Sequence, residues 1–216
     1  MKRFSVSVLM LAVLACVVPS YVLAQGANYI TLKPGIYLPQ SSDLEAFDTG
    51  FNGEIAFGHR FNPNFAAEMG IGYFNTEADF GAVGQVSGIS YSLQEKDSFY
   101  AVPITLSLKG IVPVDRWEFF GMAGIGLYYV NGDADVSGTV GGTSAGISLG
   151  DSDTVFGFHL GLGFHYNIDP TWFIGAEGKY LWTDDVKISD TVQGVPIETN
   201  FKMNGILATA VLGFKF

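Results

Sequence analysis

The chain has 216 residues and a formal net charge of −10 at pH 7, and 14% of it is aromatic while only 15% is charged. This length allows one domain or at most two, and the acidic balance disfavours nucleic acid as a partner. With one cysteine, Cys16, no intramolecular disulfide is possible.

The N-terminus has the pattern of a Sec-type secretory signal peptide. Lys2 and Arg3 precede the apolar run Val8–Val18, and Val22-Leu23-Ala24 places small or apolar residues before a cleavage site. We therefore predict that residues 1–24 are removed and that residues 25–216 form the mature domain.

Two alternatives remain for this segment. It would serve as a retained helical anchor if it were not cleaved, although Pro19 opposes a continuous helix. It would instead anchor a lipoprotein if Val13-Leu14-Ala15-Cys16 acted as a lipobox, although the apolar Val17 follows where lipoproteins usually turn polar.

Beyond this segment the chain consists of stretches in which apolar residues alternate with small or polar ones, as in strands with one apolar face. We predict eight strands, at 29–38, 51–61, 65–74, 100–109, 117–129, 156–166, 172–182 and 205–216. Short turns follow the second, fourth and sixth strands. Long connections follow the others, at 40–50, 77–98, 131–152 and 183–202.

Three local features are predicted within these segments. Pro103 removes one ladder hydrogen bond and predicts a local bulge. Small hairpins are expected to turn at Gly141-Gly142 and at Gln193-Gly194 within two of the long connections.

The distribution of charge decides which face meets lipid. In this register the apolar face carries no Lys, Arg, Asp or Glu, and a Lys or Arg facing lipid at mid-bilayer would cost roughly 2–4 kcal/mol. The other face collects the charged residues of the strands, which are Lys33, Glu54, Arg60, Glu68, Lys109, Glu118, Glu177, Lys179 and Lys215. A soluble barrel would have the opposite arrangement.

We therefore predict an all-β fold, an eight-stranded antiparallel transmembrane β-barrel in the bacterial outer membrane. Its short turns are expected to be periplasmic and its longer loops extracellular. Outward-facing aromatic residues gather at two levels, as expected of the girdles at the two membrane interfaces. Outer-membrane lipid and lipopolysaccharide are accordingly the expected surroundings, with the acidic loops either binding divalent cations there or simply solvated.

The last strand ends on an apolar face formed by Leu212, Phe214 and Phe216. The terminal aromatic resembles the signal that is read by the barrel assembly machinery of the outer membrane. We predict that these three residues form the membrane-insertion signature.

The second half of the chain resembles small outer-membrane barrels, above all the OmpW family and the related opacity-type barrels of the porin family. The resemblance rests on Pro103–Leu106, Gly121–Gly126, Trp172–Tyr180, Asp185–Ile188 and Val211–Phe216. It implies an eight-stranded barrel whose narrow, partly apolar lumen is associated with the passage of small hydrophobic compounds.

Eight strands enclose a space just wide enough for side chains or one small ligand. Near the short turns we predict a polar plug of paired charges, formed by Arg60, Glu68, Lys109, Glu118, His165 and Lys215. Higher in the lumen we predict an apolar wall formed by Phe74, Met122, Tyr128, Leu207 and Val211. This wall either encloses a pocket for a small hydrophobic ligand or belongs to a filled, structural lumen.

Neither a metal site, a cofactor nor an enzymatic site is predicted. His159 and His165 share a face but lie about 20 Å apart along a strand, too far to bind one metal ion. No Ser-His-acid set is evident from the spacing. The alternative to a conduit or binding pocket is a structural or adhesive surface protein that acts through its long loops.

Overall fold

The computed structural model describes residues 28–86, 89–192 and 195–216, so the predicted signal peptide lies outside the described part. Its strands are β1 (Asn28–Pro39), β2 (Gly50–Asn62), β3 (Phe65–Val86), β4 (Ile89–Val114), β5 (Trp117–Val140), β6 (Thr143–Asn167), β7 (Trp172–Thr183), β8 (Val186–Val192), β9 (Val195–Phe201) and β10 (Gly205–Lys215). One turn of 3-10 helix, η1 (Ser42–Leu44), follows β1. No helix in the described part is both long and apolar enough to cross a membrane.

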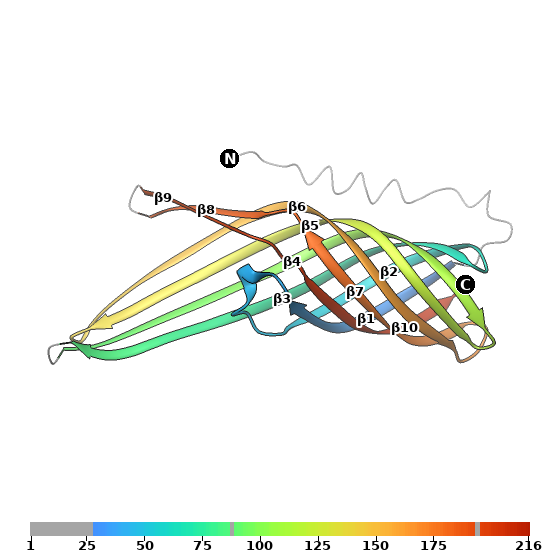
Figure 1. Cartoon of the computed structure of the whole chain (residues 1–216), viewed down its shortest axis with the longest axis horizontal. Coiled ribbons are helices and arrows are strands. Elements are labelled where there is room, and N and C mark those ends of the chain that lie inside the picture. Colours follow the sequence, from blue (N-terminus) through green and yellow to red (C-terminus); the bar gives the residue numbers. More distant parts are fainter. Residues whose placement is uncertain (1–27, 87–88, 193–194) are drawn as a thin grey trace.

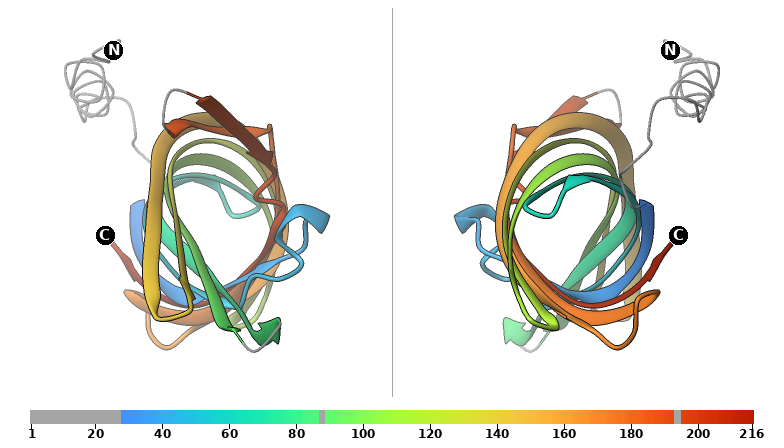
Figure 2. Two further views of the ribbon diagram at one scale, coloured as in Figure 1. Left: turned by 90° about the vertical axis from the view of Figure 1, so that its left-hand side faces the viewer. Right: turned by 90° about the vertical axis from the view of Figure 1, so that its right-hand side faces the viewer.

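Eight of these strands form a closed antiparallel barrel in the order β1-β10-β7-β6-β5-β4-β3-β2, and the end-on views show the ring (Figure 2). The last strand closes it by pairing with the first, with Tyr29 opposite Lys215. Beyond β10, the backbones of Phe216 and Asn28 exchange two hydrogen bonds of 2.9 and 3.1 Å. The predicted eight-stranded barrel is confirmed.

The connections after β3 and β5 are predicted to be loops. In the structure they are continuations of the strands. β3 and β4 stay paired as far as Val86 and Ile89, and β5 and β6 stay paired as far as Val140 and Thr143. Together they project from one end of the barrel as long hairpins (Figure 1). Outside the bilayer no lipid requires an apolar outer face, so the strands continue with polar and glycine residues on the outside.

The two predicted hairpin turns have different outcomes. The turn at Gly141-Gly142 is confirmed, and both glycines adopt a positive φ, of 57° and 89°, that other residues rarely adopt. β8 and β9 form a separate two-stranded hairpin. Its predicted turn at Gln193-Gly194 lies outside the described residues.

The predicted bulge at Pro103 is wrong. Pairing between β3 and β4 is interrupted beside Pro103 but resumes without a shift, from Ile71↔Ile104 to Phe74↔Ala101. The proline therefore costs ladder pairing without inserting an extra residue. The register shift in this sheet occurs instead between Arg60 and Asn62, at the short turn from β2 to β3.

Apolar side chains cover the outside of the barrel, and aromatic pairs stand at both of its ends. Trp172 and Phe214 lie 5.0 Å apart between ring centroids at the short-turn end. Tyr180 and Trp182 lie 4.4 Å apart at the other end. This arrangement suits a barrel whose apolar band lies between two interfacial belts.

Candidate functional site

Inside the barrel, three acidic and three basic side chains meet at mid-height. We call this group the lumen ion cluster, and its members are Lys33, Glu54, Glu68, Lys109, Glu177 and Lys179. All six are at least nine-tenths buried. Alternation along five different strands directs each of them into the lumen, because successive side chains of a strand point to opposite faces.

Lys33 of β1 is the centre of the lumen ion cluster. Its ammonium nitrogen lies 2.8 Å from a carboxylate oxygen of Glu54 and 3.1 Å from one of Glu177. It also bonds the carboxylate of Glu68. One cation thus joins three anions that come from three other strands.

The two other lysines complete the network. Lys109 lies 2.8 Å from Glu68 and 3.2 Å from Glu177. Lys179 lies 2.8 Å from Glu54 and 3.3 Å from Glu177. The formal charges therefore cancel, as buried charges require if they are not to destabilise the fold.

The three carboxylates also stand close enough to share one metal ion, with one oxygen of each of Glu54, Glu68 and Glu177 within 4.8 Å of the others. Carboxylate oxygens are the ligands that Mg²⁺ and Ca²⁺ prefer. Here, however, the ammonium of Lys33 already contacts all three. A metal ion would have to displace that lysine.

A second group of charges closes the short-turn end, and we call it the basal ion cluster. Arg60 donates two hydrogen bonds, of 3.0 and 2.9 Å, to the two oxygens of Glu118. Lys215 approaches Glu118 at 3.5 Å and donates a hydrogen bond of 2.5 Å to the side-chain oxygen of Asn167. Bidentate arginine–carboxylate pairs of this kind have a fixed geometry.

Apolar side chains separate the two ion clusters. This lower apolar cluster consists of Tyr29, Ala66, Ile111, Phe120, Met122, Phe173 and Val211. The cavity left beside it measures about 20 Å³, which is room for about one water molecule. The lumen is therefore closed to larger solutes at this level.

The predicted polar plug is not one group of paired charges. Glu68 and Lys109 belong to the lumen ion cluster, while Arg60, Glu118 and Lys215 form the basal ion cluster.

His165 makes no ion pair in the described structure. Its ring packs on Phe120 and Phe173, with centroids 4.6 and 4.5 Å apart, and its Nε2 atom is buried without a hydrogen-bond partner among the described residues. Glu118 lies directly opposite His165 on β5, but the ring turns to the aromatic side chains instead of the carboxylate.

Above the lumen ion cluster lies a larger apolar group. This upper apolar cluster consists of Tyr37, Leu44, Phe74, Phe99, Ala101, Tyr128, Val130, Val155, Leu181, Val186, Met203 and Leu207. The rings of Tyr37 and Phe74 lie 4.6 Å apart, and the Tyr37 hydroxyl donates to the backbone oxygen of Met203 at 3.1 Å. These contacts fill the lumen.

The apolar wall predicted from the sequence is consequently divided. Phe74, Tyr128 and Leu207 lie in the upper apolar cluster and are buried by their neighbours. Met122 and Val211 lie in the lower apolar cluster, on the other side of the charged layer. The five residues do not enclose a common pocket.

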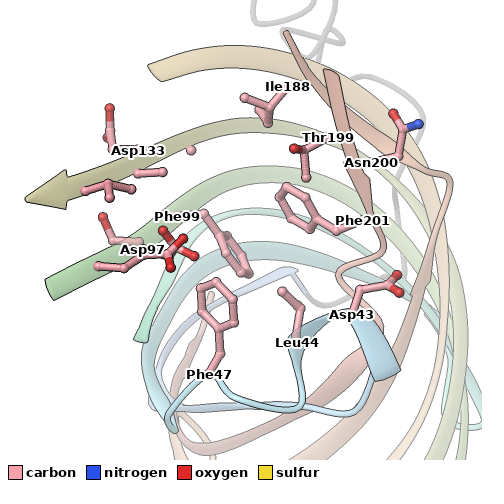
Figure 3. Close-up of a pocket in the computed structure, with 15 residues that line it drawn as sticks. Asp43, Leu44, Phe47, Asp97, Phe99, Asp133, Ile188, Thr199, Asn200 and Phe201 are labelled. Atoms are coloured by element: carbon pink, nitrogen blue, oxygen red, sulfur yellow. The ribbon is translucent and has the colours of Figure 1, made fainter. Parts of the chain in front are cut away.

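An open pocket lies higher still, at the end that carries the long hairpins. This mouth pocket has a volume of about 370 Å³ and is lined by Asp43, Leu44, Phe47, Glu95, Asp97, Ser98, Phe99, Gly132, Asp133, Ala134, Val136, Ile188, Thr199, Asn200 and Phe201. In Figure 3 Leu44, Phe47, Phe99 and Phe201 surround its lower part. Its size falls in the range of pockets that bind small molecules.

Four parts of the chain build the mouth pocket: the segment that contains η1, the extended β4, the extended β5 and the β8–β9 hairpin. Two carboxylates of β6 hold β8 in place. Asp153 accepts a hydrogen bond of 2.9 Å from the backbone N–H of Lys187, and Asp151 accepts one of 3.2 Å from that of Ser189. The β8–β9 hairpin therefore stands beside the opening as one wall.

Acidic side chains lie among the apolar ones in the mouth pocket. The Oδ1 atom of Asp97 is buried and has no hydrogen-bond partner among the described residues. Burial, together with the neighbouring Glu95, raises the pKa of the Asp97 carboxyl above its ordinary value. The pocket thus combines aromatic walls with uncompensated negative charge.

Sequence reasoning missed the mouth pocket because its residues lie in stretches that were predicted to be loops. One signal was present. Tyr91 and Leu93 alternate with the polar Ser92 and Gln94, which indicates a strand that continues into the predicted connection.

The comparisons with known proteins agree with this architecture. Residues 8–214 match the family model of the outer membrane protein beta-barrel domain. The chain belongs to this family. Its place in the bacterial outer membrane follows, and by the pattern of such barrels the short turns face the periplasm and the long hairpins the cell exterior.

Three solved structures show the same fold at low sequence identity. OprG from Pseudomonas aeruginosa has a TM-score of 0.59 and 15% identity, with 89% of this chain and 96% of that chain covered. A major outer membrane protein from Thermus thermophilus has a TM-score of 0.52 and 10% identity, with 88% of this chain and 99% of that chain covered. Neisserial surface protein A has a TM-score of 0.50 and 18% identity, with 89% of this chain and 100% of that chain covered. None of the curated proteins compared with the chain matches it.

One hydrogen-bonded pair within the barrel was not expected from the sequence. Ser107 and His159 face each other across β5, and the Ser107 hydroxyl lies 2.8 Å from Nε2 of His159. Gly124 stands between them, and a Cβ atom there would approach that nitrogen to 2.5 Å. Both side chains are buried and, among the described residues, no carboxylate hydrogen-bonds the ring, so the pair lacks the acid of a catalytic triad.

Proposed function

We propose that this outer-membrane barrel binds small hydrophobic molecules at its extracellular end, in the mouth pocket. The observation that carries the proposal is a cavity of about 370 Å³ with aromatic and aliphatic walls. Pockets of this size and lining bury most of the surface of a small ligand. The role agrees with the function that the OmpW-like sequence pattern implies.

The proposal is for binding at the mouth rather than for a straight channel through the barrel. Below the mouth pocket lie the upper apolar cluster, the lumen ion cluster, the lower apolar cluster and the basal ion cluster. The space left beside the lower apolar cluster holds about one water molecule. A solute large enough to fill the mouth pocket therefore cannot pass straight down the lumen in this structure.

The second candidate function is attachment or surface structure. It is favoured by the hairpins of β3–β4 and β5–β6, which project beyond the barrel and expose Phe80, Val83, Leu93 and Ile147. Exposed apolar side chains above a membrane are typical of surfaces that meet a partner.

Binding of naphthalene to the purified protein in lipid nanodiscs tests the first function. We expect saturable binding above the partition into empty nanodiscs. Phe47→Ala and Phe201→Ala are expected to weaken it, because both rings line the mouth pocket. Phe80→Ala is the matched control, because that ring is exposed on the hairpin outside the lining.

Two deletions of different length in the β5–β6 hairpin separate the binding function from the attachment function. Deletion of residues 132–151 takes away both the projecting part of β5–β6 and a wall of the mouth pocket. A shorter deletion of 138–146 leaves the described lining in place. Loss of cell attachment with the shorter deletion, while naphthalene binding is retained, favours the attachment role. Absence of saturable naphthalene binding by the wild-type protein contradicts the binding role.

A further inference from the structure

The charge of the mouth pocket has one sign. Its lining includes Asp43, Glu95, Asp97 and Asp133, and the lining contains no Lys, Arg or His. Three lysines, Lys96, Lys187 and Lys202, each neighbour a lining residue in sequence. Lys202 pairs with Asp185 at 3.9 Å, and Lys187 is exposed. Lys96 lies on the opposite face of β4 from Glu95 and Asp97. It pairs there with Glu77 at 3.1 Å.

These acids differ in the hydrogen bonds that their carboxylates accept from the protein. Asp43 accepts a hydrogen bond of 3.2 Å from the backbone N–H of Lys202, and Asp133 accepts one of 2.9 Å from Asn131. Asp97 has no such partner for its Oδ1 atom, although that atom is buried. A cation that pairs with this carboxylate offsets the cost of its partial burial without a compensating charge.

The acids of the mouth pocket are not arranged as a metal site. Among the described residues, only Glu54, Glu68 and Glu177 stand close enough for three carboxylates to share one ion. The walls between the acids of the pocket are apolar, whereas a hard cation needs several converging oxygen ligands. The positive charge that suits this pocket therefore belongs to an organic molecule.

We propose that the mouth pocket selects amphiphiles in which an apolar body carries an ammonium or amidinium group directed at Asp97. The apolar body packs on Phe47, Phe99 and Phe201, and the cation pairs with the Asp97 carboxylate, which lines the pocket. Glu95 lies on the same face of β4 as Asp97 and adds negative potential at the same wall. This inference rests on the proposed function and adds the charge of the ligand.

Three probes with one ring system separate the contributions of charge and shape: 1-naphthylmethylammonium, 1-naphthalenemethanol and 1-naphthoate. Each is titrated against the full-length mature protein in zwitterionic nanodiscs, with empty nanodiscs as the blank. We expect the cation to bind about tenfold more tightly than the alcohol, and the anion to bind more weakly than either. Added salt should weaken binding of the cation and leave that of the alcohol unchanged.

Variants identify the group responsible. Asp97→Asn keeps the shape of the side chain and should remove most of the preference for the cation. Asp135→Asn is the matched control, because Asp135 is an exposed acid of β5 outside the lining, and it should leave the preference intact.

The outcomes distinguish this inference from the proposed function. Equal binding of the cation and the alcohol, both weakened by Phe47→Ala, would overturn the charge preference and leave the hydrophobic pocket standing. A preference that survives Asp97→Asn would overturn the assignment to Asp97. Binding of none of the three probes would contradict both.

Discussion

Lys109 of β4 and Glu177 of β7 lie 3.2 Å apart, although their strands are three places apart round the barrel. The pair therefore bridges the lumen, unlike the cross-strand pair of Lys33 and Glu54 on adjacent strands. Bridges of this kind tie opposite walls together and occupy the space through which a solute would pass.

The lumen ion cluster should be important for stability. Lys33→Met leaves three buried carboxylates with two ammonium groups, so we expect the free energy of unfolding to fall by about 3 kcal/mol. Urea unfolding in vesicles, followed by tryptophan fluorescence and heat-modifiable gel migration, measures the change. Lys96→Met is the control, because its pair with Glu77 is exposed and should contribute little. Equal effects of the two substitutions would contradict the structural role of the cluster.

The filled lumen predicts that the protein does not conduct ions steadily. We expect purified wild-type protein in planar bilayers to show no stable open level. Arg60→Ala should remain closed, because the lumen ion cluster and both apolar clusters still lie above the altered pair. A steady, water-filled conductance of the wild type would show that the layers do not seal the barrel.

Binding of the cationic probe should depend on pH. The pKa of Asp97 is raised by burial and by Glu95, so Asp97 takes up its proton at a higher pH than an ordinary aspartate does. Affinity for the naphthylmethylammonium cation should therefore be full near pH 7 and fall as the pH is lowered through that raised pKa. Affinity for the neutral alcohol should not follow this change.

Three other acids line the mouth pocket, namely Asp43, Glu95 and Asp133. Asp97→Asn provides the control, because the part of the pH dependence that it removes belongs to Asp97. An unchanged pH profile in this variant would contradict the assignment to Asp97.

The last residue should matter for assembly more than for stability. The backbone of Phe216 pairs with Asn28, and its ring stands on the exposed outer face with Phe214. Phe216→Ala should lower the yield in the outer membrane of cells and change refolding into vesicles little. Phe61→Ala, an exposed aromatic at the same end of the barrel, is the matched control. Equal yields for the two variants would contradict a signal at the C-terminus.

The alternation of side chains along each strand was enough to predict the barrel. Leu212, Phe214 and Phe216 occupy alternate positions and face lipid. Lys33 and Glu54 occupy the other set of positions on their strands and face the lumen. Alternation does not determine the height of a residue in the lumen, because the strands are tilted. For this reason the predicted plug joins Glu68 and Lys109 to the lower charges of the basal ion cluster, and the predicted wall joins Met122 to apolar residues above the lumen ion cluster.

The mouth pocket was harder to predict for a different reason. It depends on contacts between segments far apart in sequence, such as Phe47 near η1, Phe99 on β4 and Phe201 on β9. Outside the bilayer the outward faces need not be apolar, so the signal that defines a membrane strand ends where the pocket begins.

The position of a bound apolar molecule tests binding in the mouth pocket most directly. Intermolecular nuclear Overhauser effects are measured between naphthalene and phenylalanine-labelled protein in deuterated nanodiscs, with single Phe→Leu substitutions for assignment. Binding in the mouth pocket predicts contacts from naphthalene to Phe47, Phe99 and Phe201 and none to Phe120 or Phe173 below the lumen ion cluster. Contacts to those lower rings, or contacts confined to the lipid-facing phenylalanines, would contradict binding in the mouth pocket.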